Sequence, residues 1–348
     1  MLEIQPITIL QIVFFVQVCF GAILIANQSR YQGLRNLLLL TATLLVFNVL
    51  EENNITRSIH LVTPIFSLLT GPLFFWFVHR LVKPSVQLTS RRIIHVLPAL
   101  LCLPFTHWVQ VILFLGTFSQ ISYMVFSIKL IRSYHYATAN LTADSHAYRI
   151  DWLRKLLVVA VTIGVIDLVR LNLQPILALD FAIKWYFATQ TGYLIMFSWM
   201  IYKSINQPEL FEAWQDKTVW SPDGNLTVQD EGETAQAQSI FKWLDSKVIN
   251  EHLYRLPRLT LRQLAIEVDM NEKDLSWAIN CGGGVTFSDY INRLRINEVQ
   301  AKIVEKPNAN FLDLALAAGF NSKSTFNAVF KQQTGLTPTQ YSESVARN

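Results

Sequence analysis

Between residues 321 and 331 the chain carries a cluster of side chains suited to contact with nucleic acid. Lysine side chains bind phosphate or guanine, and hydroxyl and amide groups bond phosphate oxygens or adenine edges. The cluster consists of Asn321, Ser322, Lys323, Ser324, Thr325, Asn327 and Lys331. Asn321 or Ser322 is also placed to cap a helix, and capping alone is the alternative role for Ser322 and Ser324. This pattern predicts a DNA-binding surface.

Two short helices around a glycine turn are predicted to hold this cluster. Leu312, Leu314, Ala315 and Leu316 give the first helix an apolar side, Gly319 ends it, and Phe326, Val329 and Phe330 recur with helical spacing in the second. This arrangement is a helix-turn-helix, in which the start of the second helix faces the major groove.

The same stretch resembles the second helix-turn-helix of AraC/XylS-type transcription regulators. The matching positions are Ala315, Gly319, Phe320, Ser322, Ser324, Phe326, Phe330, Lys331, Gly335, Pro338 and Tyr341. Upstream, a first helix-turn-helix at 260–280 fits through Leu261, Leu264, Ala265, Val268, Leu275, Ser276 and Ile279, and residues 287–296 fit the start of the connecting helix. The resemblance implies sequence-specific binding of promoter DNA, and RNA polymerase is a further candidate partner.

The first motif departs from the pattern of that family. Its recognition helix begins with Glu272 and Asp274 around Lys273 and runs into CGGGV, where basic residues are usual. Carboxylates are repelled by phosphate, although they can accept a hydrogen bond from cytosine. The candidate DNA contacts of this motif are Lys273, Ser276, Trp277 and Asn280.

The composition divides the chain into two parts. The chain has 348 residues, of which 51% are hydrophobic and only 16% charged, and most of the apolar excess precedes residue 204. We therefore expect an all-α protein: a polytopic seven-helix transmembrane bundle at 1–203, a polar linker at 204–238, and an all-α domain with two helix-turn-helix motifs at 239–348. Within that domain, the connecting helix is expected at 287–304 and the second motif at 311–331.

Seven apolar segments are near the ~20 residues needed to cross a bilayer. They are residues 7–26, 34–50, 59–82, 93–105, 107–131, 156–173 and 181–202, the fourth being short and containing two prolines. Lys and Arg are concentrated in the first, third and fifth loops. The positive-inside rule then predicts an outside N-terminus and a cytoplasmic C-terminal domain in a bacterial inner membrane.

Polar residues inside or at the ends of spans are candidates for a signal site. Those expected near the outer surface are Asn48, Glu51, Glu52, Asp167, Arg170 and Lys184. If these helix ends meet, they form a polar cup open to the outside. The alternative is an Asp167 to Arg170 ion pair that neutralises itself, with Lys184 reaching the interface. Gln17, His79 and Gln120 are expected to make interhelical hydrogen bonds.

The motifs favour a regulator over an enzyme. No catalytic motif, metal-ligand spacing or cofactor fingerprint is present, and the three cysteines form no recognisable framework. The expected partners are promoter DNA, membrane lipid and a second copy of the chain, since dimerisation raises the effective concentration of weak DNA-binding domains. The signal ligand is unknown. The rival interpretations are a transporter with a regulatory tail, or a membrane scaffold whose tail binds protein.

Overall fold

A computed structural model of the chain describes residues 5–57, 60–83, 94–173, 176–206, 231–306 and 309–347. The regular structure of these residues is helical, apart from one isolated bridge between Thr142 and Thr260, so the all-α prediction is confirmed. The chain forms two compact units. Unit 1 comprises Met1–Arg132 and Ile150–Gln207, and unit 2 comprises Ser133–Arg149 and Pro208–Asn348. Residues 133–149, which the sequence assigned to the membrane region, thus belong with the C-terminal unit.

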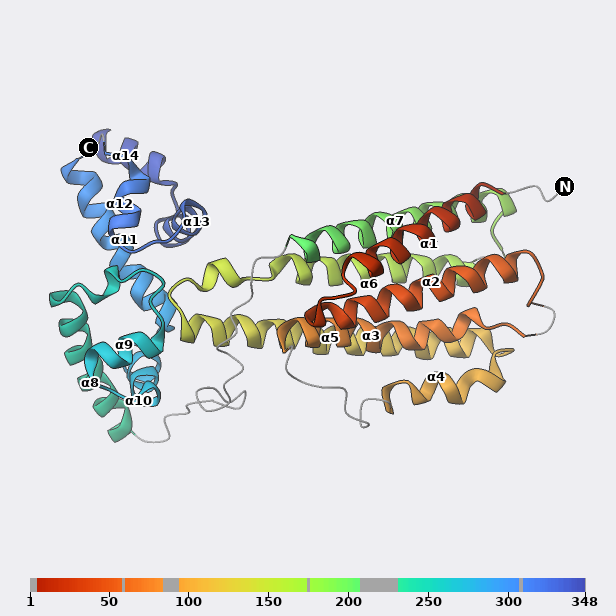
Figure 1. The fold of residues 1–348 in the computed structure, drawn as a ribbon, viewed down its shortest axis with the longest axis horizontal. Helices are drawn as coiled ribbons and strands as arrows, with labels where there is room; N and C mark the ends of the chain where they lie inside the picture. Colours follow the sequence, from red (N-terminus) through yellow and green to blue (C-terminus); the bar gives the residue numbers. More distant parts are fainter. Residues whose placement is uncertain are drawn as a thin grey trace. The chain divides into compact units, whose positions relative to one another are not determined.

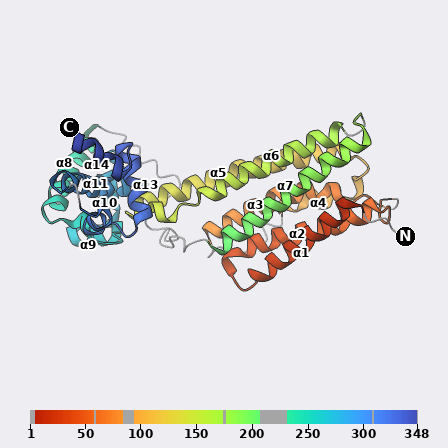
Figure 2. The same ribbon diagram turned by 90° about the horizontal axis from the view of Figure 1, so that it is seen from above.

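Unit 1 is a bundle of long helices (Figure 1). Helices α1, α2, α3 and α7 run side by side, as Figure 2 shows from a second direction. The helices of this part of the chain are α1 (Pro6–Leu24), α2 (Gln32–Glu52), α3 (Phe66–Val82), α4 (Leu97–Cys102), α5 (Val109–Leu141), α6 (Asp151–Leu173) and α7 (Leu179–Ile205). Helix α5 belongs to both units, because the division falls between Arg132 and Ser133.

The outward faces of this bundle carry large apolar side chains. Phe20 and Ile23 of α1 are 60% and 71% exposed, and Phe114 and Phe118 of α5 are 70% and 68% exposed. Apolar surface on this scale indicates contact with something other than water. Among the described residues, four helices are long and apolar enough to cross a membrane: Pro6–Leu24, Ser29–Glu52, Thr63–Val82 and Val109–Leu141.

Seven spans were predicted, but only four helices among the described residues are long and apolar enough to cross a membrane. The fourth predicted span, at 93–105, holds only the six-residue α4 and a 3-10 turn at Leu103–Phe105, which is too short to cross a bilayer as a helix. Its two prolines explain the interruption, because proline lacks the backbone N–H that continues a helix. The sixth and seventh segments form α6 and α7, with 23 and 27 residues, but charged residues such as Asp167, Arg170 and Lys184 dilute their apolar character.

The start of α5 nevertheless lies beside the start of α3. The Leu103 carbonyl oxygen lies 2.8 Å from the ring Nε2 of His60, which precedes α3. Ala99 and Ile112 also pack with Ile65 and Leu68 at that starting end of α3. Helix α5 thus starts at the end of α3 opposite Val82.

Close backbone approach and interhelical hydrogen bonds hold the bundle together. A side chain at Gly33 of α2 would meet backbone atoms of Trp76 and Phe77 of α3 at 2.6 to 2.8 Å. The Gln17 amide donates to the Leu194 carbonyl of α7, and the Gln120 amide donates to the Ser67 carbonyl of α3. These two predicted interhelical bonds are present, and the His79 ring stacks on Trp76 of its own helix.

From residue 231 onward, the described part of unit 2 contains seven α-helices and one π-helical turn. They are α8 (Glu231–Asn250), α9 (Leu261–Val268), α10 (Glu272–Trp277), a π-helical turn (Ala278–Gly282), α11 (Phe287–Glu305), α12 (Phe311–Ala317), α13 (Lys323–Thr334) and α14 (Pro338–Arg347). Side-chain caps set where five of them start: Thr260, Asn271, Thr286, Asn310 and Ser322 each accept a backbone N–H of the following turn. Helix α8 begins at Glu231, inside the stretch predicted as linker, and most of that linker lies outside the described residues.

Candidate nucleic-acid interface

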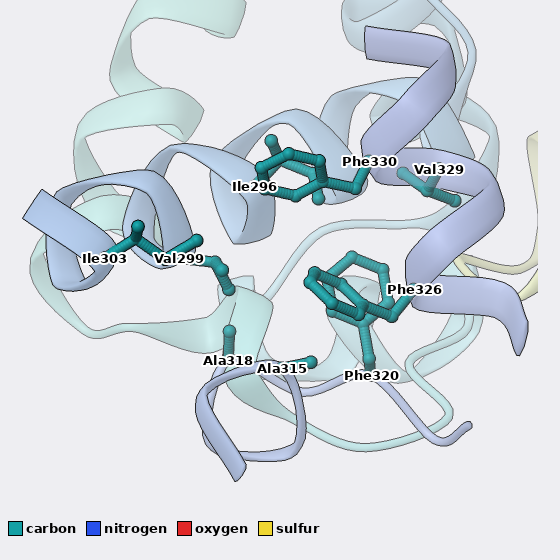
Figure 3. Packing of buried hydrophobic residues seen from close by; sticks show 9 residues of the cluster. All are labelled: Ile296, Val299, Ile303, Ala315, Ala318, Phe320, Phe326, Val329 and Phe330. Atoms are coloured by element: carbon teal, nitrogen blue, oxygen red, sulfur yellow. The ribbon is translucent and has the colours of Figure 1, made fainter. Parts of the chain in front are cut away.

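A core of aromatic and aliphatic residues fixes the orientation of α13. Figure 3 shows the Phe330 ring of this helix beside Ile296 of α11 and the Phe326 ring beside Phe320, in a core that also includes Val299 and Val329. The Phe326 ring lies 5.4 Å from that of Phe320 and 5.5 Å from that of Phe330, each edge to face. Because one side of α13 is buried in this way, the opposite side is presented outward.

The outward side of α13 is basic and polar. Five exposed residues share it at helical spacing: Lys323, Ser324, Asn327, Ala328 and Lys331. Four of them were predicted from the sequence as DNA contacts. Ala328 was missed because it has no polar group, although its position four residues after Ser324 would have placed it there. A small methyl group in the middle of a recognition surface suits contact with a thymine methyl.

The other three predicted residues of this cluster have contacts within unit 2. Ser322 caps α13 by accepting the Thr325 N–H at 3.1 Å. Thr325 is only 6% exposed, and its hydroxyl accepts a bond from Ser322 Oγ at 2.9 Å. The Asn321 amide donates to the carboxylate of Asp144. Ser322 and Thr325 are therefore less accessible than the exposed set, and Asn321, although exposed, is bound to Asp144.

Gly319 determines how the turn before α13 is made. Its φ is +98°, a conformation that favours glycine, and a Cβ there would meet the Arg255 carbonyl oxygen at 2.7 Å. Gly319 lies against the 3-10 turn Leu253–Arg255 that precedes the first motif.

The first motif has a comparable core and a different surface. Leu275, Ala278 and Ile279 are buried at the same spacing as the three core residues of α13. Of the predicted contacts, Lys273 is exposed, and Ser276 and Trp277 are half-buried. Asn280 is half-buried, and its amide donates to the Ser276 carbonyl at 2.8 Å. Glu272 pairs with Arg262 at 3.8 Å.

The glycine run after α10 allows close packing against α8. A Cβ at Gly282 would lie 2.2 Å from the Ala237 carbonyl oxygen of α8, and one at Gly283 would lie 2.7 Å from the Phe241 ring. Gly284 has no neighbour within 4 Å but has a φ of +65°. The π-helical turn and α8 therefore meet through these glycines.

Arg295 of α11 connects the two motifs from the interior of unit 2. Its side chain is fully buried and donates to the carbonyl oxygens of Tyr254 at 2.8 Å and Leu256 at 2.9 Å. Its guanidinium carbon also lies 5.5 Å from the Phe320 ring centre, beside the second motif. Burial lowers the pKa of Arg295 to about 10, while the nearby Asp144 carboxylate opposes this shift.

The candidate signal residues of unit 1 come together only in part. The Glu52 carboxylate accepts bonds from the Gln11 amide at 2.8 Å and the Tyr186 hydroxyl at 3.0 Å. The guanidinium of Arg170 pairs with Asp167 at 2.7 Å and lies 4.7 Å from the Tyr186 ring centre. Tyr186 thus joins the Glu52 group to the Asp167 pair.

The remaining three residues of that set have separate environments. Glu51 accepts bonds from the backbone N–H groups of Val62 and Thr63 and from the Thr63 hydroxyl, which orders the turn before α3. Lys184 pairs with the exposed Asp180 on its own helix at 2.7 Å. Asn48 is half-buried in α2. The predicted cup is therefore reduced to Glu52, Asp167 and Arg170 with Gln11 and Tyr186.

Comparison with known proteins identifies the C-terminal part. A family described as "Helix-turn-helix domain" matches residues 264–344. The Melibiose operon regulatory protein of Escherichia coli strain K12 is 34% identical over 83 residues, which are 24% of this chain and 27% of that protein. The Probable transcription factor PqrA of Proteus vulgaris is 28% identical over 104 residues, which are 30% of this chain and 80% of that protein.

The family match lies within the part of the chain that resembles AraC-type regulators. The chain thus spans little more than a quarter of the melibiose regulator's length. No solved structure matches the chain. Residues 264–344 are a helix-turn-helix DNA-binding domain of the AraC type, and they include α13 with its exposed face.

Proposed function

We propose that this protein is a membrane-embedded, one-component transcriptional regulator that binds promoter DNA through unit 2 under the control of unit 1. The observation that carries the proposal is the outward face of α13, where Lys323, Ser324, Asn327 and Lys331 are exposed together on the domain that matches the DNA-binding family. Its function is binding and not catalysis. The polar group around Tyr186 is the candidate signal site, and a homodimer on DNA is the expected active form.

Two features support a cytoplasmic unit 2 and an odd number of crossings. The loop after α5 packs into unit 2, so both must lie on one side of any membrane that unit 1 spans. Helices α3 and α5 also start side by side, so α5 crosses in the same sense as α3, even though α4 is short. Helix α6 then crosses the membrane away from the side of unit 2, and α7 crosses back to that side.

The test is DNA binding by the full-length protein in detergent. The probes are the DNA upstream of its own gene and sequences selected from a random library, each measured across a series of salt concentrations. Each phosphate contact removed lowers the slope of log affinity against log salt by about 0.9. The double variant Lys323→Ala, Lys331→Ala is expected to lose specific binding and to flatten this slope.

Lys242→Ala is the matched control, because it removes an exposed lysine from α8, outside both recognition helices. It should leave specific binding and the salt slope close to those of the wild type. If the double variant binds DNA as the wild type does, α13 does not contact DNA. In that case the rival interpretation, a membrane scaffold whose tail binds protein, is preferred.

A further inference from the structure

The loop between α5 and α6 is built into unit 2. The Ala143 N–H donates to the Leu259 carbonyl at 3.0 Å, and Thr142 pairs with Thr260 in the isolated bridge. The Ala143 carbonyl accepts bonds from the Ser288 hydroxyl at 3.0 Å and the Asn292 amide at 2.8 Å. These bonds fix the position of Ala143 in unit 2, because they use both of its backbone groups and the buried polar side chains of α11.

Asp144 extends this loop to the second motif. Its carboxylate, only 6% exposed, lies 3.7 Å from the guanidinium of Arg295 and accepts the Asn321 amide bond. Asn321 immediately precedes Ser322, the cap of α13. Residues 142–145, which we call the docking loop, therefore contact the start of the first motif, the connecting helix and the start of the second recognition helix.

The buried Asp144 and Arg295 charges keep the docking loop from being held very tightly. Burial raises the pKa of the Asp144 carboxyl above its ordinary value, although Arg295, the Asn321 amide and Arg258 all act in the opposite direction. The cost of burying the two charges thus offsets much of their attraction. The Asp144–Arg295 pair therefore adds little net stability while the loop is docked. If the loop leaves, Arg295 stays buried without its carboxylate partner.

Helix α5 is the physical link between the docking loop and unit 1. It is continuous from Val109 to Leu141 and ends one residue before the loop. In unit 1 it is held by Gln120 and by backbone contact with Gly71 of α3. In unit 2 its residues Tyr134 and Ala137 are fully buried. The docking loop is thus joined to unit 1 by one unbroken helix.

We propose that the docking loop couples unit 1 to the recognition helix, with Asp144 as the positioning residue that holds the start of α13 through Asn321 and Arg295. The exposed face of α13 stays open while the loop is docked, so the docked state is the one that binds DNA specifically. A shift of α5 withdraws Asp144, frees the start of α13 and lowers specific affinity. This inference rests on the proposed function, whose site it regulates.

The test removes the contact and then restores it. In the full-length protein, Asp144→Ala should lower specific DNA affinity about ten-fold, within the usual range of coupling between sites. Asp144→Asn keeps the shape and the acceptor but not the charge, and should give a smaller loss. Asp151→Asn, which alters a partly exposed i,i+3 pair with Arg154, is the matched control and should bind as the wild type does.

A disulfide between Thr142→Cys and Thr260→Cys, with Cys19, Cys102 and Cys281 replaced by serine, should hold the loop in place. Facing residues of an antiparallel pair lie within the ~4.4–6.8 Å Cα separation that a disulfide spans. Under oxidising conditions it should restore specific binding to the Asp144→Ala variant, and reduction should abolish the rescue. A purely structural role of Asp144 predicts no redox dependence of specificity.

Hydrogen exchange separates this inference from the function on which it rests. Without DNA, Asp144→Ala should speed amide exchange in the first turn of α13 while leaving α9 unchanged. Faster exchange in a protein that prefers no DNA sequence would refute the proposed function and retain the coupling. Wild-type exchange and wild-type affinity in both Asp144 variants would overturn the coupling itself.

Discussion

On α13 the outward positions hold Lys323, Asn327 and Lys331, whereas the first turn of α10 holds Glu272 and Asp274 around Lys273. The buried sides of the two helices are alike, with apolar residues at the first, fourth and fifth positions of each set. Helix α13 continues regularly for 12 residues to Gly335, while α10 passes after six residues into a π-helical turn. The same fold is thus used twice, with surfaces of different charge.

This difference indicates an unequal division of labour in DNA binding. The core pattern sets the fold of each motif, and the outward residues set how strongly phosphate attracts it. We infer that α13 supplies most of the affinity and that α10 supplies less. The following predictions test that inequality and the packing on which each motif depends.

The largest expected effect is on the core of the second motif. Phe326→Ala removes a side chain that is 1% exposed and packed between two other phenylalanines, so it should cost about 3–5 kcal/mol. Hydrogen exchange in the full-length protein should show faster opening of α13 than of α10. Leu316→Ala in α12 is the control, because that side chain is 48% exposed and its loss should change little. Equal loss of protection in both motifs would mean that they unfold together.

The next effect concerns the glycine run of the first motif. Gly283→Asn should cost about 1–3 kcal/mol, because the added atoms meet the Phe241 ring and the Ile279 carbonyl oxygen. Gly284→Asn should be tolerated, because asparagine adopts positive φ more readily than most residues and this position has no close neighbour. Protection of the α10 amides from exchange measures both. A similar small cost at both positions would show that α8 adapts readily to the turn.

The comparison of lysines is the direct test of unequal DNA contact. Lys323→Ala should lower the salt slope of binding by about 0.9, the value for one phosphate contact, and Lys273→Ala should change it by much less. Both lysines are exposed and both lie in the first turn of their helices. Filter binding or fluorescence anisotropy on one DNA probe is sufficient. Equal changes in slope would remove the distinction between the two motifs.

The elements of unit 2 were predictable from the sequence because their signals are local. Caps such as Ser322, the turn glycine Gly319 and the spacing of Phe326, Val329 and Phe330 each depend on residues a few positions apart. The exposed face of α13 follows from the same spacing. Side-chain polarity alone does not reveal that Ala328 is exposed and Thr325 buried, because position on the helix determines exposure.

The tertiary links were not predictable, because they join residues that are far apart in the chain. Asp144 and Asn321 are 177 positions apart, and Gln11 and Tyr186 are 175 apart. Neither pair has a local signature, and residues 142–145 read as an ordinary polar loop between two apolar segments. The short α4 is a different case: Pro98 and Pro104 signalled an interruption, yet the overall apolarity of the segment suggested a span.

The smallest expected effect comes from making the first motif resemble the second. Asp274→Asn removes a charge from the exposed first turn of α10, and its amide can still bond the capping residue Asn271. Because a carboxylate near phosphate repels it, DNA affinity at low salt should rise a few-fold, and the gain should vanish as salt screens the charge. Asp313→Asn, in the first turn of α12, removes the same charge outside the recognition helices and is the control. A fall in affinity for the selected sequence alone would instead show that Asp274 accepts a hydrogen bond from a base. Helix α10 would then contribute sequence specificity and not electrostatic attraction to phosphate.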